Sequence, residues 1–531
     1  KGGCPRRLQA RSWLSRPILD RQVRRQRLQG KVWSGLGAVV LRFFLLSSTM
    51  LPQKEKNEEL IKHRQKEIRD QQKIYGGLSP LKSLCLLFAE YTMNNWMKDS
   101  FFGSQFLNGL NPMVIRRIDS LPKNLSVKDD MVIPNSLGTL KCEMKKGNIF
   151  LCDYTILEGV EANTINGKKQ YLTAPLVLLH KNQKDEMMPI AIQLKQKPGE
   201  DNPVFFPSDS ESDWLLAKLY VKSADFNLHE LNYHLLRTHL LAEVFAVSLK
   251  RNLPRVHPVH KILIRHTHDT LFINILARRD LISKDGIFTK FTASGGEGMI
   301  TLLGKSLSNL TYSSLCIPDD IKDRGLGDVK NFYYKEDGLK LWEIMHRFTD
   351  SFYLPSLKSM FETDSVERVQ GFLMQVFVPS SEIPQCFETK EELFKFVTMV
   401  MFTCSAQHSA VNTGQYDFYG WMPNGPSTMQ EPHHQKKGTV TETTIIKALP
   451  DIPVIIESMA TIWLLSMQAH DSSFLPDFKQ KYFTENIPCD KIRIFQERLL
   501  KLSKEIKRRN KCLGLSYTYL DPKLVENSVS I

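Results

Sequence analysis

The sequence predicts a mainly α-helical fold, in which one large helical domain carries a small β subregion near its N-terminal side. Two observations support this prediction. From Trp214 to about residue 511, apolar residues recur at the spacing of helices. Between residues 132 and 210, short strand-like runs alternate with turn signals instead. The chain has 531 residues, which is enough for a large hydrophobic core and more than one domain.

The predicted β subregion consists of short apolar runs. Turn signals such as Asn166-Gly167 separate these runs. The expected strands lie at 132–133, 149–151, 171–172 and 189–192.

The helical part contains six long periodic stretches and shows no internal repeat. Ahead of the β subregion, residues 54–75 are rich in Lys, Glu, Arg and Gln and predict a solvated helix that serves as an arm or linker. The six stretches are 214–223, 228–251, 339–361, 390–411, 453–468 and 491–509.

The net charge of +14 is unevenly distributed. Residues 1–33 contain ten Lys and Arg residues and one acid, Asp20, a net charge of +9 that leaves +5 for the rest of the chain. A basic tail rather than a basic domain therefore sets the charge. Since no zinc-finger spacing or RNP-like motif accompanies it, we expect no nucleic-acid partner.

We expect residues 1–53 to be an atypical basic extension in front of one domain, residues 54–531. The apolar run from Leu36 to Leu46 is interrupted by Arg42 and is shorter than the roughly 20 residues that span a membrane. With its basic flank it fits a targeting peptide. A disordered end or a gene-model artefact fits better, because the sequence begins with Lys1.

Nine cysteines are spread along the chain without a CxxC pair. An odd and scattered set of cysteines is typical of free thiols in a reducing compartment. We therefore expect a cytoplasmic protein.

A leucine-rich segment without Pro or Gly carries His229, His234 and His239. It predicts a buried helix, in which unsatisfied polar groups are costly. At a spacing of five, the histidines would point about 140° apart in a regular α-helix. Either they are unrelated core histidines, or a π-bulge of the kind found at functional sites aligns them around a metal. Three histidines at this spacing favour the metal.

A second helical segment carries His408 and Asn412 on one face, shortly before the stop signal Gly414. Alone, this pair is better explained as two buried polar residues that bond to each other. Beside the first segment it adds a nitrogen and a weak amide oxygen, and a loosely held metal suits catalysis. The free carboxylate of the last residue, Ile531, supplies the anion that such a shell lacks. Histidines with one carboxylate indicate non-haem iron, whereas zinc hydrolysis lacks an HExxH frame.

With these segments, the chain resembles the animal lipoxygenases from about residue 55 to 531. The sequences RNKC at 509–512 and YLDP at 519–522 are similar to the epidermis-type branch. The other matching motifs are H-x4-H-x4-H-x17-H-x8-H at 229–266, FFGSQFLNGLNPM at 101–113, WLLAK at 214–218, FTCSAQHSAVN at 402–412, GQYD at 414–417, WMPN at 421–424 and ENSVSI at 526–531.

This resemblance implies a set of site residues. One iron per chain is held by His234, His239, His408, Asn412 and the Ile531 carboxylate. Glu230 and Gln415 form a hydrogen-bonded pair that links the two ligand helices. The substrate pocket is lined by Phe226, Ala277, Leu281, Phe291, Thr292 and Thr461, and alanine at position 277 usually accompanies S-configured products.

The chain also departs from the family pattern. Members normally begin with a β-sandwich PLAT domain that binds calcium and membranes, and residues 1–53 are too short for one. We therefore expect the PLAT domain to be absent and peripheral membrane contact to be weakened. Residues 76–89 and 361–385 are shorter than in the family, and Leu276 replaces an arginine that some members use near the substrate carboxylate.

The implied activity is dioxygenation of a polyunsaturated fatty acid, arachidonate or linoleate, by hydrogen abstraction and O2 addition to give a hydroperoxide. A hydroperoxide isomerase of the epidermis type, which makes epoxyalcohols from fatty-acid hydroperoxides, shares every ligand and stays open. A third hypothesis is an inactive lipid-binding paralogue, against which the complete ligand set argues. The sequence leaves regiospecificity, native substrate and oligomeric state open.

Overall fold

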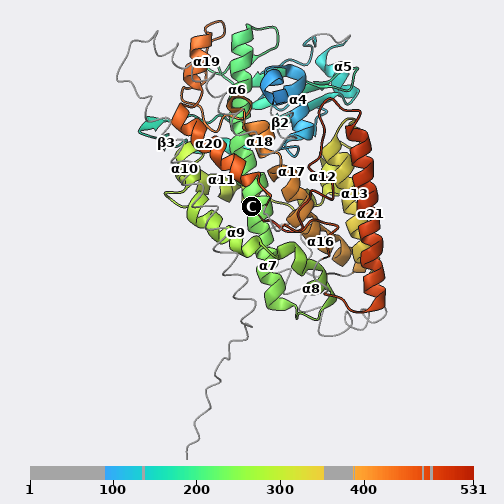
Figure 1. The fold of residues 1–531 in the computed structure, drawn as a ribbon. Coiled ribbons are helices and arrows are strands. Elements are labelled where there is room, and N and C mark those ends of the chain that lie inside the picture. Colours follow the sequence, from blue (N-terminus) through green and yellow to red (C-terminus); the bar gives the residue numbers. More distant parts are fainter. Residues whose placement is uncertain are drawn as a thin grey trace, which may run out of the picture. The chain divides into compact units, whose positions relative to one another are not determined.

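The structure is a computed structural model, and all of its described residues lie in the second of two units of the chain, Leu60–Ile531. Helices dominate this unit and a small sheet lies at one end of it (Figure 1), so the predicted mainly α fold with a β subregion is confirmed. The predicted helix at 54–75 and the predicted extension 1–53 lie outside the described residues. The described residues are 90–133, 138–351, 387, 389–468, 472–478 and 482–530.

Five antiparallel strands form the sheet in the order β1-β2-β5-β6-β7. The strands predicted at 149–151 and 189–192 are confirmed as β2 and β6, whereas 132–133 and 171–172 contribute only isolated bridges. The central strand β5 was missed, because it is buried along nearly its whole length and shows no alternation of apolar and polar residues. The bounds are β1 Ile115–Arg117, β2 Ile149–Asp153, β5 Leu176–Lys181, β6 Met187–Gln193 and β7 Val204–Phe205.

The strands β3 (Thr164–Ile165) and β4 (Lys168–Lys169) form a separate hairpin with a two-residue turn. Its turn is the predicted Asn166-Gly167, with φ of 50° and 76°. Two positive φ values are what a type I′ turn requires, and Asn-Gly adopts them at little cost.

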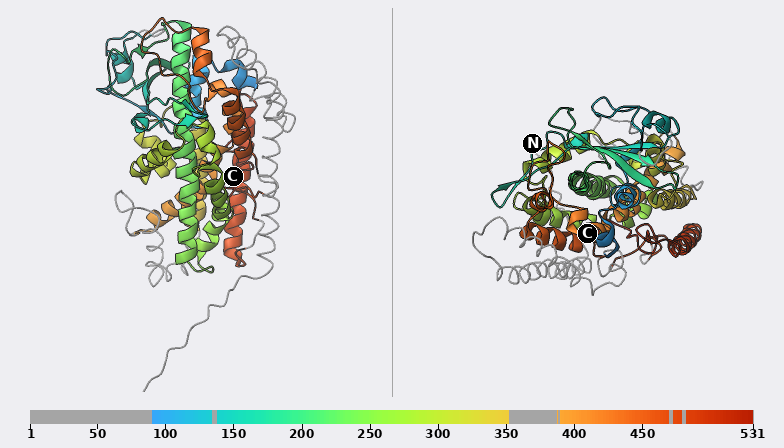
Figure 2. Two further views of the ribbon diagram at one scale, coloured as in Figure 1. Left: turned by 90° about the vertical axis from the view of Figure 1, so that its left-hand side faces the viewer. Right: turned by 90° about the horizontal axis from the view of Figure 1, so that it is seen from above.

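One continuous helix runs through the centre of the unit and carries the first histidine segment. It begins as α6 (Glu211–Leu228), becomes a π-helix over His229–Leu240 and continues as α7 (Leu241–Asn252). Ser210 caps its start by accepting a hydrogen bond from the backbone N–H of Asp213. Figure 2 shows the long helix in green, with the sheet at its upper end.

A second interrupted helix carries His408. It consists of α16 (Lys390–Phe402), a π-helical turn (Thr403–Gln407) and α17 (His408–Asn412). Thr389 and Glu392 form a capping box at its start. Both the π-helical turn and α17 pack against the π-helix of the first interrupted helix, so the two histidine segments meet at their irregular parts.

The remaining helices surround these two. α13 (Tyr333–Ser351) packs on α16 and on α21 (Asn486–Asn510), the long helix at one side of Figure 1. Of the stretch predicted at 339–361, the part beyond residue 351 lies outside the described residues. The other helices are α4 Asp99–Asn108, α5 Leu140–Lys145, α8 Pro258–Leu263, α9 Thr270–Leu276, α10 Ile287–Phe291, α11 Glu297–Ser308, α12 Ile317–Asp323, α18 Gln415–Tyr419, α19 Glu442–Ala448 and α20 Ile452–Leu465, with a π-helix at Ala277–Leu281.

Within the described part of the chain, no single helix has the length and apolar composition needed to cross a membrane. The helices α19 and α20 meet that test only as a pair, and they are bent by 60° against each other.

The contact between α13 and α21 gives a stability prediction. Leu499 lies on the buried face of α21 and is fully buried. We expect Leu499→Ala to lower the free energy of unfolding by about 2–5 kcal/mol, because it removes buried methyl groups and leaves a cavity. Urea unfolding measures the change. The exposed neighbour Lys501 is the control, since Lys501→Ala should change stability by less than about 0.5 kcal/mol.

Candidate metal centre

Three imidazole nitrogens converge at the contact of the two histidine segments. Nε2 of His239 lies 3.2 Å from Nε2 of His234 and 3.2 Å from Nε2 of His408. All three residues are buried. In the described part of the chain, this is the one group of three His, Cys, Asp or Glu residues whose ligand atoms gather within 4.8 Å. Three nitrogens that face one another cannot all be paired as donor and acceptor, whereas their lone pairs suit a cation.

The π-helix explains how histidines five residues apart share one site. Its hydrogen bonds run from residue i to i+5, so His234 and His239 point to the same side. The predicted π-bulge is confirmed. His229 serves another purpose, because its Nε2 donates to the carbonyl oxygen of Val411 at 2.8 Å. That bond ties the π-helix to α17, between His408 and Asn412.

Glu230 orients the first histidine of the centre. Its carboxylate accepts a hydrogen bond from Nδ1 of His234 at 3.2 Å. Burial would raise the pKa of Glu230, but His229 and His234 outweigh it and lower the pKa below its ordinary value. An ionised carboxylate holds the proton on Nδ1, which leaves the lone pair of Nε2 for a metal.

Asn274 of α9 orients the second histidine, and sequence reasoning missed it. Its Oδ1 lies 3.1 Å from Nδ1 of His239, and its Nδ2 donates to the carbonyl oxygen of His239 at 2.7 Å. The same Nδ2 also donates to Glu243, which keeps the amide in one orientation. Asn274 is buried. The available signal was a polar residue inside an otherwise apolar run, residues 271–276.

Asn412 and Gln415 lie at the end of α17 and the start of α18. Nε2 of Gln415 donates to Oδ1 of Asn412 at 2.6 Å. The predicted pair of Glu230 and Gln415 is not formed, since no hydrogen bond joins them among the described residues. Instead, the Glu230 carboxylate is hydrogen-bonded to His234, and the Gln415 amide is hydrogen-bonded to Asn412. The Oε1 atoms of Glu230 and Gln415 are both buried without a hydrogen-bond partner.

The C-terminal tail is buried. Ile531 itself lies outside the described residues, so its role as a ligand stays a prediction, but Val529 and Ser530 are 0% and 5% exposed. Nδ1 of His266 donates to the carbonyl oxygen of Asn527 at 2.8 Å. Burial lowers the pKa of His266 to about 3, so it acts as a neutral donor. The tail is therefore fixed up to its last described residue, as a ligand at the chain end requires.

The six predicted pocket residues are all buried. The rings of Phe226 and Phe291 lie 6.5 Å apart. The helix α10 packs on α20 and on the π-helix Ala277–Leu281 (Figure 1), which brings together the elements that carry Phe291, Thr461, Ala277 and Leu281. The hydroxyls of Thr292 and Thr461 donate to carbonyl oxygens of their own helices, at 2.8 and 2.7 Å. Both threonines thus present methyl groups rather than unsatisfied donors. That these residues line a substrate pocket stays a prediction.

A mainly helical fold around a buried three-histidine centre defines a class of non-haem metal proteins. Within that class, the model of the family Lipoxygenase matches residues 44–516. The chain belongs to the lipoxygenase family, and the resemblance of its motifs is confirmed.

Two curated relatives illustrate the similarity. Human hydroperoxide isomerase ALOXE3 is 43% identical over 451 residues, and rat polyunsaturated fatty acid lipoxygenase ALOX15B is 44% identical over 456 residues. Both matches cover 83% of this chain, but 63% of the isomerase and 67% of the rat lipoxygenase. The chain thus spans less than two thirds of the length of the isomerase.

Solved lipoxygenase structures share the fold. A calcium-dependent 11R-lipoxygenase superposes with a TM-score of 0.78 at 37% identity, over 83% of this chain and 67% of that chain. An anaerobic structure of a lipoxygenase variant, delta413-417:GS LOX, in complex with arachidonate gives a TM-score of 0.78 at 31% identity. That match covers 91% of this chain and 76% of the other.

Proposed function

We propose that this protein is a non-haem iron dioxygenase that converts polyunsaturated fatty acids to hydroperoxides. The observation that carries the proposal is the convergence of three histidine Nε2 atoms in a member of the lipoxygenase family. The relatives support the substrate class, since they include polyunsaturated fatty acid lipoxygenases and a lipoxygenase structure in complex with arachidonate.

The residues present fit iron. Three buried imidazole Nε2 atoms face one another with 3.2 Å between neighbours, so one cation among them would meet all three. Imidazole is a suitable ligand for iron. We assign the iron to His234, His239, His408, Asn412 and the Ile531 carboxylate. Bound there, iron supplies the one-electron redox chemistry that hydrogen abstraction from a fatty acid needs.

Residues around the centre orient the histidine ligands and exclude water from the substrate side. Glu230 and Asn274 fix the ring orientations of two histidines, so the metal geometry is set before substrate arrives. The aromatic and aliphatic side chains of Phe226, Phe291 and Leu281 exclude water from the side where the acyl chain binds, which protects a radical from side reactions.

A second candidate function is that of a hydroperoxide isomerase. The 43% identity to human ALOXE3 favours it, and the ligand set does not distinguish the two reactions. Regiospecificity and the native substrate depend on the pocket depth and stay open in both cases.

Oxygen uptake and product analysis separate the candidates. The full chain is incubated with linoleate or arachidonate and, separately, with their hydroperoxides. A dioxygenase consumes O2 with the free acid and yields a hydroperoxide, whereas an isomerase yields epoxyalcohol from the hydroperoxide without O2 uptake. Turnover of neither substrate by iron-loaded protein would contradict the proposal and favour a lipid-binding paralogue.

Asn274 provides a test of the metal assignment itself. We expect Asn274→Ala to weaken iron binding about 10–100-fold, because His239 loses the acceptor that fixes its ring. Metal analysis after dialysis against a graded chelator series measures the affinity. Asn252→Ala, which removes an amide that donates to the carbonyl oxygen of Ser248 in α7, should keep the affinity of the parent protein. Equal losses in both variants would speak against a specific role of Asn274.

A further inference from the structure

The helix α21 holds an unusual share of the charge of the chain. Its 25 residues contain eight Lys and Arg residues and three acids, a net charge of +5. Residues 34–531 together also carry +5. Outside the N-terminal tail, the positive charge of the protein is therefore concentrated on one helix, and the remainder is balanced.

Most of these cations have no acidic partner among the described residues. Of the eight, Arg493, Lys507 and Arg509 form ion pairs, with acids on α21 itself or on the segments around it. Of the acids of α21, Glu505 pairs with Lys340 of α13. The buried face of α21 is apolar, so the cations lie on its flanks and outer side. Those that form no ion pair or hydrogen bond with described residues are Lys491, Arg498, Lys501, Lys504 and Arg508, and Lys511 follows directly after the helix.

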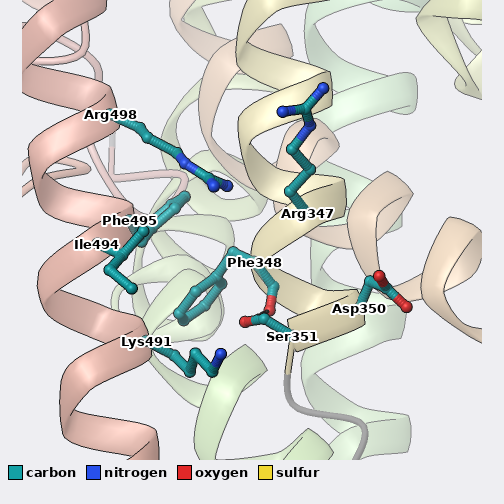
Figure 3. Close-up of a pocket in the computed structure, with 8 residues that line it drawn as sticks. All are labelled: Arg347, Phe348, Asp350, Ser351, Lys491, Ile494, Phe495 and Arg498. Carbon is teal, nitrogen blue, oxygen red and sulfur yellow. Dashed lines mark hydrogen bonds between the residues drawn. The ribbon is translucent and has the colours of Figure 1, made fainter.

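A pocket of about 250 Å³ opens between α13 and α21 (Figure 3). Lys491, Ile494, Phe495 and Arg498 line it from α21; their spacing of three, four and seven residues places them on one helix face. Arg347 lines it from α13. Arg347 and Arg498 extend from the facing helices at one end of the pocket, and Lys491 lies at the other end.

Two phenylalanine rings form an apolar floor of the pocket, and the nearby acids leave its positive charge largely in place. Phe348 and Phe495 stack with ring centres 4.3 Å apart beneath the cations. Asp350 points away from the space between the helices (Figure 3), and Glu343 pairs with Arg347 along α13. Glu343 engages only Nε of Arg347, so the Nη atoms of Arg347 remain available to an anion together with Arg498 and Lys491.

We propose that α21 and this pocket form a docking surface for an anionic phospholipid membrane, in which Arg347 and Arg498 bind a headgroup phosphate. A guanidinium pair is well suited to a phosphate, because each side chain donates two hydrogen bonds in one plane. The row of free cations along α21 attracts the negative surface potential that surrounds such a headgroup.

Charge complementarity and an exposed apolar side chain favour this occupant. A soluble anion would use the pocket alone and would leave the cations at Lys501, Lys504 and Arg508 without a counterpart. Ile487, at the start of α21, is 53% exposed and can enter the acyl boundary next to the headgroups. The inference does not depend on the proposed catalysis, since binding is measured without a substrate.

Vesicle sedimentation with the full chain tests the surface. We expect binding to mixed phosphatidylcholine–phosphatidylserine vesicles that weakens with rising NaCl, and little binding to phosphatidylcholine alone. The variant K501Q/K504Q/R508Q should bind the mixed vesicles at least about tenfold more weakly. The pocket variant K491Q/R498Q should also bind more weakly. Unchanged binding by the pocket variant would overturn the headgroup site.

The matched control removes the same charge elsewhere. K123Q/K128Q/K141Q replaces three exposed lysines near the sheet that form no ion pair with any described residue, and it should bind as the parent does. The basic N-terminal tail is present in all variants, so it contributes equally. An equal loss in this control would show that net charge alone drives binding and would overturn the docking surface.

The labelling rates of two cysteines give a second measurement, which reports where vesicles contact the protein and does not depend on binding by the N-terminal tail. Cys512, next to Lys511, and Cys142 of α5 are both free and exposed. Anionic vesicles should slow maleimide labelling of Cys512 several-fold and leave that of Cys142 unchanged, as measured by peptide mass analysis. Equal rates at Cys512 with and without vesicles would place the contact elsewhere.

Discussion

Replacing His239 by alanine is expected to remove the bound iron and to lower turnover by about a thousandfold or more. His239 is the middle member of the centre, because its Nε2 is 3.2 Å from that of His234 and from that of His408. Its loss takes one of three nitrogens and leaves the other two without a common neighbour. A thousandfold corresponds to about 4 kcal/mol, within the range that a bound metal contributes to a reaction.

Metal content and oxygen uptake on the same preparation check this prediction. His257→Ala is the control, since that buried histidine accepts a hydrogen bond from the N–H of Val259 and caps α8 away from the centre. We expect the control to keep its iron and most of its turnover. Stoichiometric iron in the His239 variant would show that the histidine cluster is not the iron site.

Appending one residue after Ile531 is expected to abolish turnover while the fold stays intact. The added peptide bond converts the terminal carboxylate into a neutral amide carbonyl, so the shell loses its only anion. The preceding residues are held tightly, with Ser530 5% exposed and Asn527 bonded to His266. A new carboxylate one residue further on cannot reach the same place without moving this tail.

The side chain at the end should matter far less than the position of the carboxylate. Ile531→Val is therefore the matched control, because it keeps a terminal carboxylate and changes one methylene. We expect it to retain iron and turnover, while circular dichroism shows the same helix content in both variants. An extended protein with normal iron content and turnover would disprove the role of the chain end.

The sequence predicted those parts of the site and fold that depend on residues close together in the chain. A spacing of five between His234 and His239 is incompatible with a shared face on an α-helix, so the sequence left either unrelated histidines or a π-bulge around a metal, and the structure has the π-helix. The turn at Asn166-Gly167 was predictable for the same reason, since two positive φ values demand those residues. The four-residue spacing of His408 and Asn412 indicated a second ligand-bearing helix, although His408 lies 169 residues from His239.

What the sequence missed depends on tertiary contacts. No local rule indicates that Asn274 contacts His239, 35 residues earlier in the chain. The predicted hydrogen bond between Glu230 and Gln415 is absent, since these side chains bond to His234 and Asn412. A sequence motif gives the position of a residue in the chain but does not determine its hydrogen-bond partner. The strand β5 was missed because a strand covered on both faces loses the alternation that identifies strands.

The continuous helix from α6 through the π-helix to α7 has a consequence for assembly. His234 and His239 share one backbone segment, so two of the three nitrogens are positioned as soon as that helix forms. His408 joins only after a loop of 169 residues has closed. The complete set of three nitrogens therefore exists only when α17 has docked. By linkage, any metal that binds all three would stabilise this docked state over a partly folded one.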